Sequence, residues 1–253
     1  MDRLTQRRRR HRVRTFGLAA LALGVVGIAS FLTWASTPMP PEPGPLATAR
    51  ADSAFTLSET ADGVVLAPEN PNGTGLVFIS GARVDPAAYA NKLSGIADAG
   101  VTVVIARPTL NFAIFETRPL STFEGLASTS RVVTWYVGGH SLGGVRACQY
   151  AADAPPDTVA GVILFGSYCA ADLSHSSLPV LTLSAARDGL STPAKIADAA
   201  DLLPTDARLV TLPGADHAQF GDYGAQPGDN PATASDAQTQ DEITSAVLKF
   251  LGQ

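Results

Sequence analysis

Six short β-rich runs recur between residues 75 and 213 and are almost free of charged residues, as buried parallel strands are. Helix-like stretches separate them, each opening with a capping residue or proline and closing near glycine or proline. The six predicted strands span residues 75–80, 101–106, 132–138, 158–166, 179–185 and 207–213. The predicted helices span residues 85–100, 141–155, 192–204 and 241–253.

Strand alternating with helix predicts a doubly wound, mostly parallel α/β sheet over residues 51–253, with right-handed crossovers. A more polar pair of runs, residues 54–59 and 63–68, is expected to form an antiparallel edge at its start. In such a sheet the chemistry sits in the crevice at the carboxyl ends of the strands.

The segment "GGHSLGG" places Ser141 between Gly139 and Gly143, after one of these strands and before a helix. This is the pattern of a nucleophile elbow, a turn so sharp that side chains at the flanking positions would clash. The pattern alone is moderately specific, because glycine-rich turns also have purely structural uses. Ser141 is therefore the predicted nucleophile if later strands supply a base and an acid.

The chain offers four histidines as the base. His11 lies in an arginine-rich tail, and His140 adjoins the serine, where the turn points neighbouring side chains apart. His175 lies in a polar loop, whereas His217 directly follows a predicted strand. His217 is the predicted general base, with a structural loop histidine as the alternative.

A base needs a carboxylate that orients it and stabilises the imidazolium. Asp188 ends the stretch "LPVLTLSAARDG", at the mouth of a strand, and is the predicted acid. The chain order of serine, aspartate and histidine is then that of an α/β-hydrolase. Three competing aspartates are Asp172, Asp216 and Asp222.

Two backbone amides are expected to hold the oxyanion. One is the N–H of Leu142, at the start of the helix, and the other should come from the loop after the first parallel strand. Gly81 in that loop permits close approach, and the N–H of Ala82 is the predicted second donor, with Arg83 as the alternative.

Four stretches, "LVFISGARVDPAAYANKLSGIADAGVTVVIARPTLNFAIFE", "YVGGHSLGGVRACQYA", "LPVLTLSAARDG" and "GADHAQFGDYGAQPGD", together resemble the α/β-hydrolase fold-5 family, near the dienelactone-hydrolase branch. The likeness covers roughly residues 60–252, and "HAQFGDYG" is its most specific part. It implies a hydrolase without a large cap domain, with Ser141, Asp188 and His217 matching the family's triad. The chain departs at "ISGAR", where the family more often has paired glycines.

Residues 1–50 differ in composition from the rest of the chain. Residues 1–15 form a basic tail, with seven arginines, and residues 16–36 form a predicted transmembrane anchor. A signal peptide cut near Ala35 or Ser36 is the alternative, and either one exports the remainder of the chain. Residues 37–50 are expected to be a proline-rich linker, of which residues 37–45 should be an extended, semi-rigid spacer.

The body is acidic, since the whole chain carries a net charge of −5 despite the basic tail. This charge argues against nucleic acid as a partner. The sequence contains no metal-ligand spacing, dinucleotide fingerprint or phosphate loop, so no cofactor and no metal are expected. Cys148 and Cys169 fall on the exported side, where a disulfide is permitted.

These features predict a serine hydrolase of small-molecule or lipid-like esters, acting outside the cytoplasm. The same triad in an acyltransferase is one alternative. A catalytically silent binding domain on the same fold is another, which an intact triad argues against.

Overall fold

The computed structural model describes residues 3–155 and 157–253, with side chains described from residue 15 onward. It divides into two compact units, which meet between Pro38 and Met39 in the sequence. The first contains helix α1 (Arg3–Ala35). The 21 residues Thr15–Ala35 of α1 are long and apolar enough to cross a membrane, and the most apolar 18-residue window among them is not buried.

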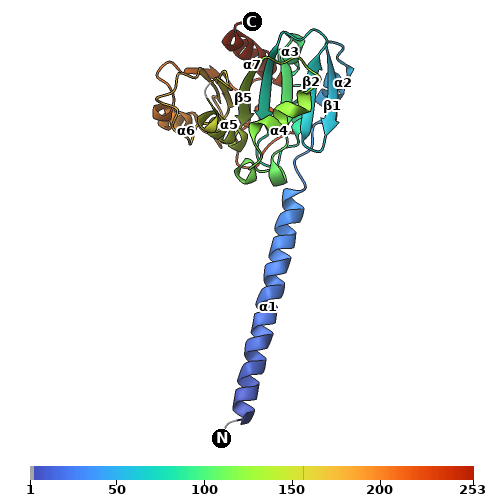
Figure 1. The fold of residues 1–253 in the computed structure, drawn as a ribbon, viewed down its shortest axis with the longest axis vertical. Helices are drawn as coiled ribbons and strands as arrows, with labels where there is room; N and C mark the ends of the chain where they lie inside the picture. Colours follow the sequence, from blue (N-terminus) through green and yellow to red (C-terminus); the bar gives the residue numbers. More distant parts are fainter. Residues whose placement is uncertain (1–2, 156) are drawn as a thin grey trace. The chain divides into compact units, whose positions relative to one another are not determined.

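The second unit is built on one sheet, of which Figure 1 labels β1, β2 and β5. Its strands lie in the order β1-β2-β4-β3-β5-β6-β7-β8. β1 and β2 are antiparallel, β2 is antiparallel to β4, and the remaining neighbours are parallel. This confirms the predicted α/β-hydrolase sheet with its antiparallel edge. The strands are β1 (Phe55–Thr60), β2 (Gly63–Pro68), β3 (Thr74–Ile79), β4 (Thr102–Ala106), β5 (Thr134–His140), β6 (Val162–Phe165), β7 (Val180–Ala185) and β8 (Arg208–Leu212).

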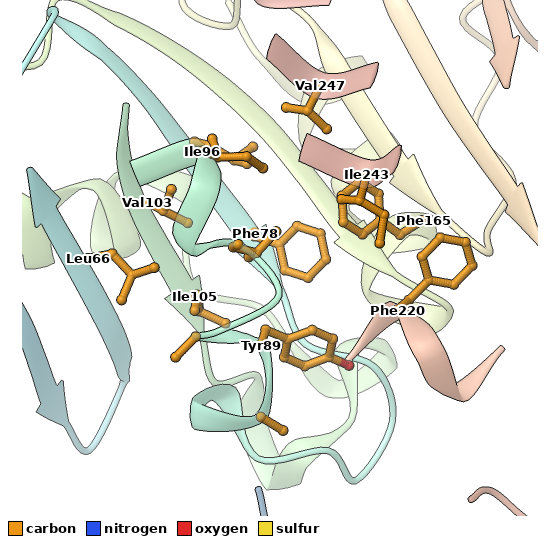
Figure 2. Close-up of a cluster of buried hydrophobic side chains, with 14 of the residues drawn as sticks. Leu66, Phe78, Tyr89, Ile96, Val103, Ile105, Phe165, Phe220, Ile243 and Val247 are labelled. Carbon is orange, nitrogen blue, oxygen red and sulfur yellow. The ribbon is translucent and has the colours of Figure 1, made fainter. Parts of the chain in front are cut away.

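Both faces of the central strands β3, β4, β6 and β7 are buried, which is why these strands are apolar at nearly every position, whereas the edge strands β1 and β8 are largely exposed. In β3, Leu76 and Phe78 belong to one core and Val77 and Ile79 to the other. The first core holds helices α3 (Ser94–Asp98) and α7 (Asp236–Leu251), and the second holds α4 (Leu120–Glu124) and α5 (Leu142–Asp153). Figure 2 shows the aromatic centre of the first core, where the ring of Phe78 packs edge-on against Phe165.

Two predicted helices are shorter than expected. The stretch 85–100 forms a 3₁₀ turn, η1 (Pro86–Tyr89), and then α3. The stretch 192–204 forms α6 (Pro193–Asp198) and another 3₁₀ turn, η5 (Ala200–Leu202). In contrast, α7 begins five residues before its predicted start, because the Ser235 hydroxyl caps it by accepting a bond from the Gln238 N–H.

The expected linker over residues 37–50, with its extended spacer over residues 37–45, is corrected by the structure. Met39 pairs with Val84 of the body, and residues Pro43–Ala51 form helix α2, whose Leu46 and Ala49 are buried in the first core. Proline is compatible with this helix because Pro43 occupies its first position, where the missing N–H costs nothing. The packed body therefore begins near Met39, about a dozen residues earlier than predicted.

Candidate active site

Ser141 lies at the junction of β5 and α5, at the carboxyl edge of the sheet. Its backbone has φ +52° and ψ −124°, a region that residues other than glycine rarely occupy. Its N–H donates to the carbonyl of Phe165, the last residue of the neighbouring strand β6, at 3.0 Å. Ser141 therefore has the strained strand-to-helix geometry of a nucleophile elbow.

Glycine is required at positions 139 and 143 because backbone atoms, not side chains, occupy the space that a Cβ would need. A Cβ added at Gly139 would lie 2.5 Å from the carbonyl carbon of Gly143. A Cβ added at Gly143 would collide with the carbonyl oxygen of Ile79 and lie 2.7 Å from that of Ser80. The strand, the helix and the loop after β3 thus meet at a point with no room for a methyl group.

Asp188 and His217 are hydrogen-bonded to each other and almost completely buried. The distance from His217 Nδ1 to Asp188 Oδ2 is 2.7 Å. The other carboxylate oxygen, Oδ1, accepts the N–H groups of Leu190 at 2.8 Å and Ser191 at 2.6 Å. Because a carboxylate only accepts, Nδ1 of His217 carries the proton and Nε2 is left as the acceptor in the neutral ring.

Asp188 follows β7 and His217 follows β8, so both lie at the same sheet edge as Ser141. Within the described chain, Nε2 of His217 has no hydrogen-bonding partner, and no bond joins it to the Ser141 hydroxyl. Such bonds are often long in ligand-free enzymes and tighten when substrate binds.

The competing candidates have other roles in the structure. His175 is exposed in the loop after β6. Asp172 accepts bonds from the N–H and hydroxyl of Ser174 in the same loop. Asp216 accepts the N–H groups of Gln219 and Ala232, and Asp222 lies 3.0 Å from the buried ammonium group of Lys92.

The N–H groups of Ala82 and Leu142 are the candidate oxyanion donors. They differ from the N–H of Arg83, the alternative donor, in having no hydrogen-bond partner among the described residues. The N–H of Arg83 donates to the carbonyl of Asn111 at 2.7 Å, so it is already engaged. The N–H groups of Ala82 and Leu142 make no hydrogen bond to any described residue, and both residues are partly exposed. Of the amides of Ala82 and Arg83, only that of Ala82 remains to bind a substrate oxygen.

A buried polar network that was not predicted from the sequence lies behind these amides. The N–H of Gly81 donates to the Tyr89 hydroxyl at 2.9 Å, and that hydroxyl lies 2.9 Å from Nδ1 of His140. The His140 ring packs 4.4 Å from the ring of His217, centroid to centroid. Burial, and then the electrostatic repulsion that a protonated His217 would exert, hold the pKa of His140 well below its usual value, so this ring is neutral.

This network fixes several orientations at once. Since Gly81 donates to the Tyr89 hydroxyl, the hydroxyl proton is directed to Nδ1 of His140. Burial raises the pKa of Tyr89, which keeps that proton in place. A Cβ at Gly81 would lie 2.8 Å from Nδ1 of His140, so only glycine fits there. The signals in the sequence were a histidine directly before the serine and a tyrosine in "DPAAY".

Other sequence features have structural roles. Phe220 is fully buried between Phe165 and His140, so it packs the core and does not line an open pocket. Arg107 forms an ion pair with Asp85 at 3.1 Å.

Cys148 of α5 and Cys169, beyond β6, are joined by a disulfide, which ties the elbow helix to the loop after β6. Among the described residues, no group of three or more His, Cys, Asp or Glu side chains is placed to hold a metal ion.

Comparisons with known proteins agree with this architecture. A family model described as "Alpha/beta hydrolase family" matches residues 75–241. No curated protein sequence matches the chain.

Several solved structures share the fold at low sequence identity. A predicted CIB-like hydrolase from Thermoplasma acidophilum is 13% identical with a TM-score of 0.56, covering 78% of this chain and 98% of its own. Est1E from Butyrivibrio proteoclasticus is 12% identical with a TM-score of 0.53, covering 79% and 100%. A thermophilic esterase from Thermogutta terrifontis is 14% identical with a TM-score of 0.51, covering 79% and 93%. With the family matched over most of its length, the chain belongs to the alpha/beta hydrolase family.

Proposed function

We propose that this hydrolase, whose fold is carboxylesterase-like, cleaves a carboxylic ester through Ser141, His217 and Asp188. One observation carries the proposal. A buried, hydrogen-bonded aspartate–histidine pair lies at the same sheet edge as a serine held in an elbow at φ +52°. A binding module has no use for all three groups in this arrangement.

In the proposed reaction the Ser141 hydroxyl oxygen attacks the ester carbonyl carbon while Nε2 of His217 takes the hydroxyl proton. The negative oxygen of the tetrahedral intermediate accepts the N–H groups of Ala82 and Leu142. Collapse breaks the bond to the alcohol, which leaves with the proton from His217. Asp188 stabilises the imidazolium and holds its tautomer throughout.

Water then repeats the sequence on the acyl-enzyme. His217 removes a proton from the water as it attacks, and the intermediate collapses to release the carboxylic acid and regenerate Ser141. An acceptor alcohol in place of water would make the same acyl-enzyme an intermediate of acyl transfer. Product analysis with and without added alcohol separates the two reactions.

Labelling with a fluorophosphonate probe tests the nucleophile directly. An esterase among the structural neighbours, from Thermogutta terrifontis, has been solved "phosphoramylated by tabun", so this fold accepts an organophosphorus group in that protein. The wild-type chain should be labelled and Ser141→Ala should not. Ser58→Ala, at an exposed position on β1, is the matched control and should label normally. Labelling that survives Ser141→Ala contradicts the proposal.

We also propose that Thr15–Ala35 anchors the enzyme in a membrane, with the arginine-rich tail in the cytoplasm and the body outside. Carbonate-washed membranes from cells should retain the full-length chain, and protease added to intact cells should digest the body. A shorter chain in the medium would instead mean that the segment is a cleaved signal. A full-length chain wholly in the cytosolic soluble fraction contradicts both.

A further inference from the structure

An exposed apolar loop lies between β4 and α4, at the same sheet edge as the candidate site. It contains two 3₁₀ turns, η2 (Thr109–Asn111) and η3 (Ala113–Phe115). Leu110 is 36% exposed, Ile114 65% and Phe115 40%. Half of the large exposed hydrophobic residues described in the body therefore belong to one loop of seven residues.

This loop is held in place by a buried carboxylate at its end. Glu116 is 3% exposed and accepts bonds from the N–H of Thr109, where the loop begins, and from Arg118, just beyond the loop. Burial alone would raise the pKa of Glu116, but the bonds from Arg118 and the two backbone amides outweigh it and lower that pKa to about 2. The exposed side chains of Leu110, Ile114 and Phe115 are therefore carried by a loop that hydrogen bonds hold in place.

The backbone of the loop is left-handed at two successive residues and strained at one of them. Leu110 and Asn111 have φ +55° and +57°, which asparagine tolerates but which costs leucine of order 1 kcal/mol or more, and such strain is concentrated at functional sites. In this conformation the Asn111 carbonyl accepts a hydrogen bond from the N–H of Arg83. That bond joins the loop to the residue directly after Ala82, the proposed oxyanion donor.

The loop also lies beside the elbow. η3 packs against α5, and its Ala113 is buried in the same core as Ala147 and Cys148 of that helix. β4 and β5 flank β3 in the sheet, so the loop after β4 and Ser141 after β5 are two strand spacings apart, about 10 Å. An acetyl group bound at Ser141 would not reach the loop, whereas a long aliphatic chain would.

We infer that the substrate is an ester with a long aliphatic chain, which lies along Leu110, Ile114 and Phe115 while its carbonyl group is at Ser141. This inference rests on the proposed esterase activity and names its substrate class. Contact between the chain and these side chains removes apolar surface of both from water, which lowers KM or raises kcat/KM for long-chain esters only.

The test compares acetyl and dodecanoyl esters of p-nitrophenol, using the full-length protein in detergent solution below the substrate's aggregation limit. The double variant Leu110→Asn with Ile114→Gln removes two exposed apolar groups, and asparagine tolerates the backbone conformation at position 110. We expect kcat/KM for the dodecanoyl ester to fall about tenfold and that for the acetyl ester to change less than twofold. Leu209→Gln, at a 56% exposed position on β8, is the control and should change neither.

The outcomes separate this inference from the esterase proposal. Hydrolysis of either ester that disappears in Ser141→Ala supports the proposed function by itself. If Ser141-dependent hydrolysis is observed, two results overturn the inference. One is that the double variant loses equal activity on both esters, and the other is that the wild type does not prefer the longer chain. Absence of Ser141-dependent hydrolysis of both esters overturns the proposed function instead.

A second arm identifies where the chain comes from. The same dodecanoyl ester is offered either free in solution or embedded in phosphatidylcholine vesicles. A larger effect of the double variant on the vesicle-borne ester assigns the substrate to a membrane lipid, and an equal effect assigns it to a soluble ester. Both results support a long aliphatic chain, while an effect in neither presentation contradicts it.

Discussion

The two sides of the candidate site are held in place by different physical means. The side after β7 and β8 depends on charged and polar side chains, because Asp188 binds His217 and two backbone amides. The side after β3, β4 and β5 depends on backbone conformation. Of the five residues other than glycine described with positive φ, four lie there: Arg83, Leu110, Asn111 and Ser141.

This difference indicates which kind of substitution each side of the candidate site tolerates. On the aspartate–histidine side, positive φ is confined to glycines among the described residues, and the identity of two side chains carries the arrangement. On the elbow side, amide groups must point at one place, and glycines and left-handed residues provide this. Substitutions on the two sides, and in the contacts that link them, should therefore differ in the size of their effect and in the property that they damage.

Asp188→Asn should remove most of the activity while the fold survives, which is the largest effect that we expect. An asparagine of similar shape can donate to Nδ1, which favours the wrong tautomer of His217, and such a change costs about four orders of magnitude in kcat. Steady-state hydrolysis together with a thermal melt measures both quantities. Asp172→Asn, in an exposed turn, should leave activity unchanged. Near-normal turnover by Asp188→Asn would show that the aspartate–histidine side does not depend on this carboxylate.

Lys92→Met should lower the free energy of unfolding by about 3–5 kcal/mol, because it leaves Asp222 as a buried charge without its cation. Asp222 lies five residues after His217, and its N–H donates to the Ala88 carbonyl, so this pair links the two sides. Urea unfolding measures the loss, and adding Asp222→Asn should recover much of it.

The control for Lys92 is another ion pair of the body. Arg50 and Glu59 are about half exposed, so Arg50→Met should cost about 0–1 kcal/mol. Equal losses in Arg50→Met and Lys92→Met would mean that burial of the Lys92 pair has no energetic consequence.

Tyr89→Phe should cost about 1–3 kcal/mol of stability, since the Gly81 N–H and His140 Nδ1 both lose their buried partner. We expect kcat to fall while KM changes little, because the loop that carries Ala82 is less firmly oriented. Tyr223→Phe, whose hydroxyl binds only Gln226 among the described residues, is the comparison and should affect kcat less. A fall in stability with kcat unchanged would reduce this network to a structural role.

His140 should make stability depend on pH, with the smallest effect of the four. Its pKa in the folded chain is lowered by burial, and then by the electrostatic repulsion that a protonated His217 would exert, whereas in the unfolded chain it is near 6.5. Below about pH 6.5 the unfolded state therefore binds more protons, so stability falls as the pH falls. Comparing unfolding at pH 7 and pH 5, His140→Asn should lose this component of the slope, and His175→Asn, at an exposed position, should keep it. An unchanged slope in His140→Asn contradicts the prediction.

The sequence predicted the parts of the molecule that residue type determines. The apolar runs predicted the parallel strands, and spacing after successive strands selected Asp188 and His217, which the structure joins by a hydrogen bond. The catalytic roles of Ser141, Asp188 and His217 remain predictions. The proline-rich stretch was misread because proline at the first position of a helix looks like proline in a spacer.

What the sequence could not show depends on strand order and on backbone angles. Tyr89 and His140 are 51 residues apart and meet because β3 and β5 are neighbours, an arrangement that no local pattern reveals. Likewise, nothing in the residue type at Leu110 indicates positive φ, since leucine rarely adopts it, although asparagine at position 111 does so more readily.

The meeting of Gly139 and Gly143 limits how this protein can evolve. A larger residue in a core is often accommodated when a neighbour mutates to a smaller one. At these two positions the obstructing atoms are backbone atoms of Gly143, Ile79 and Ser80, which every residue possesses. A smaller neighbouring side chain therefore cannot make room, and a lineage that loses either glycine must shift the backbone of the elbow itself.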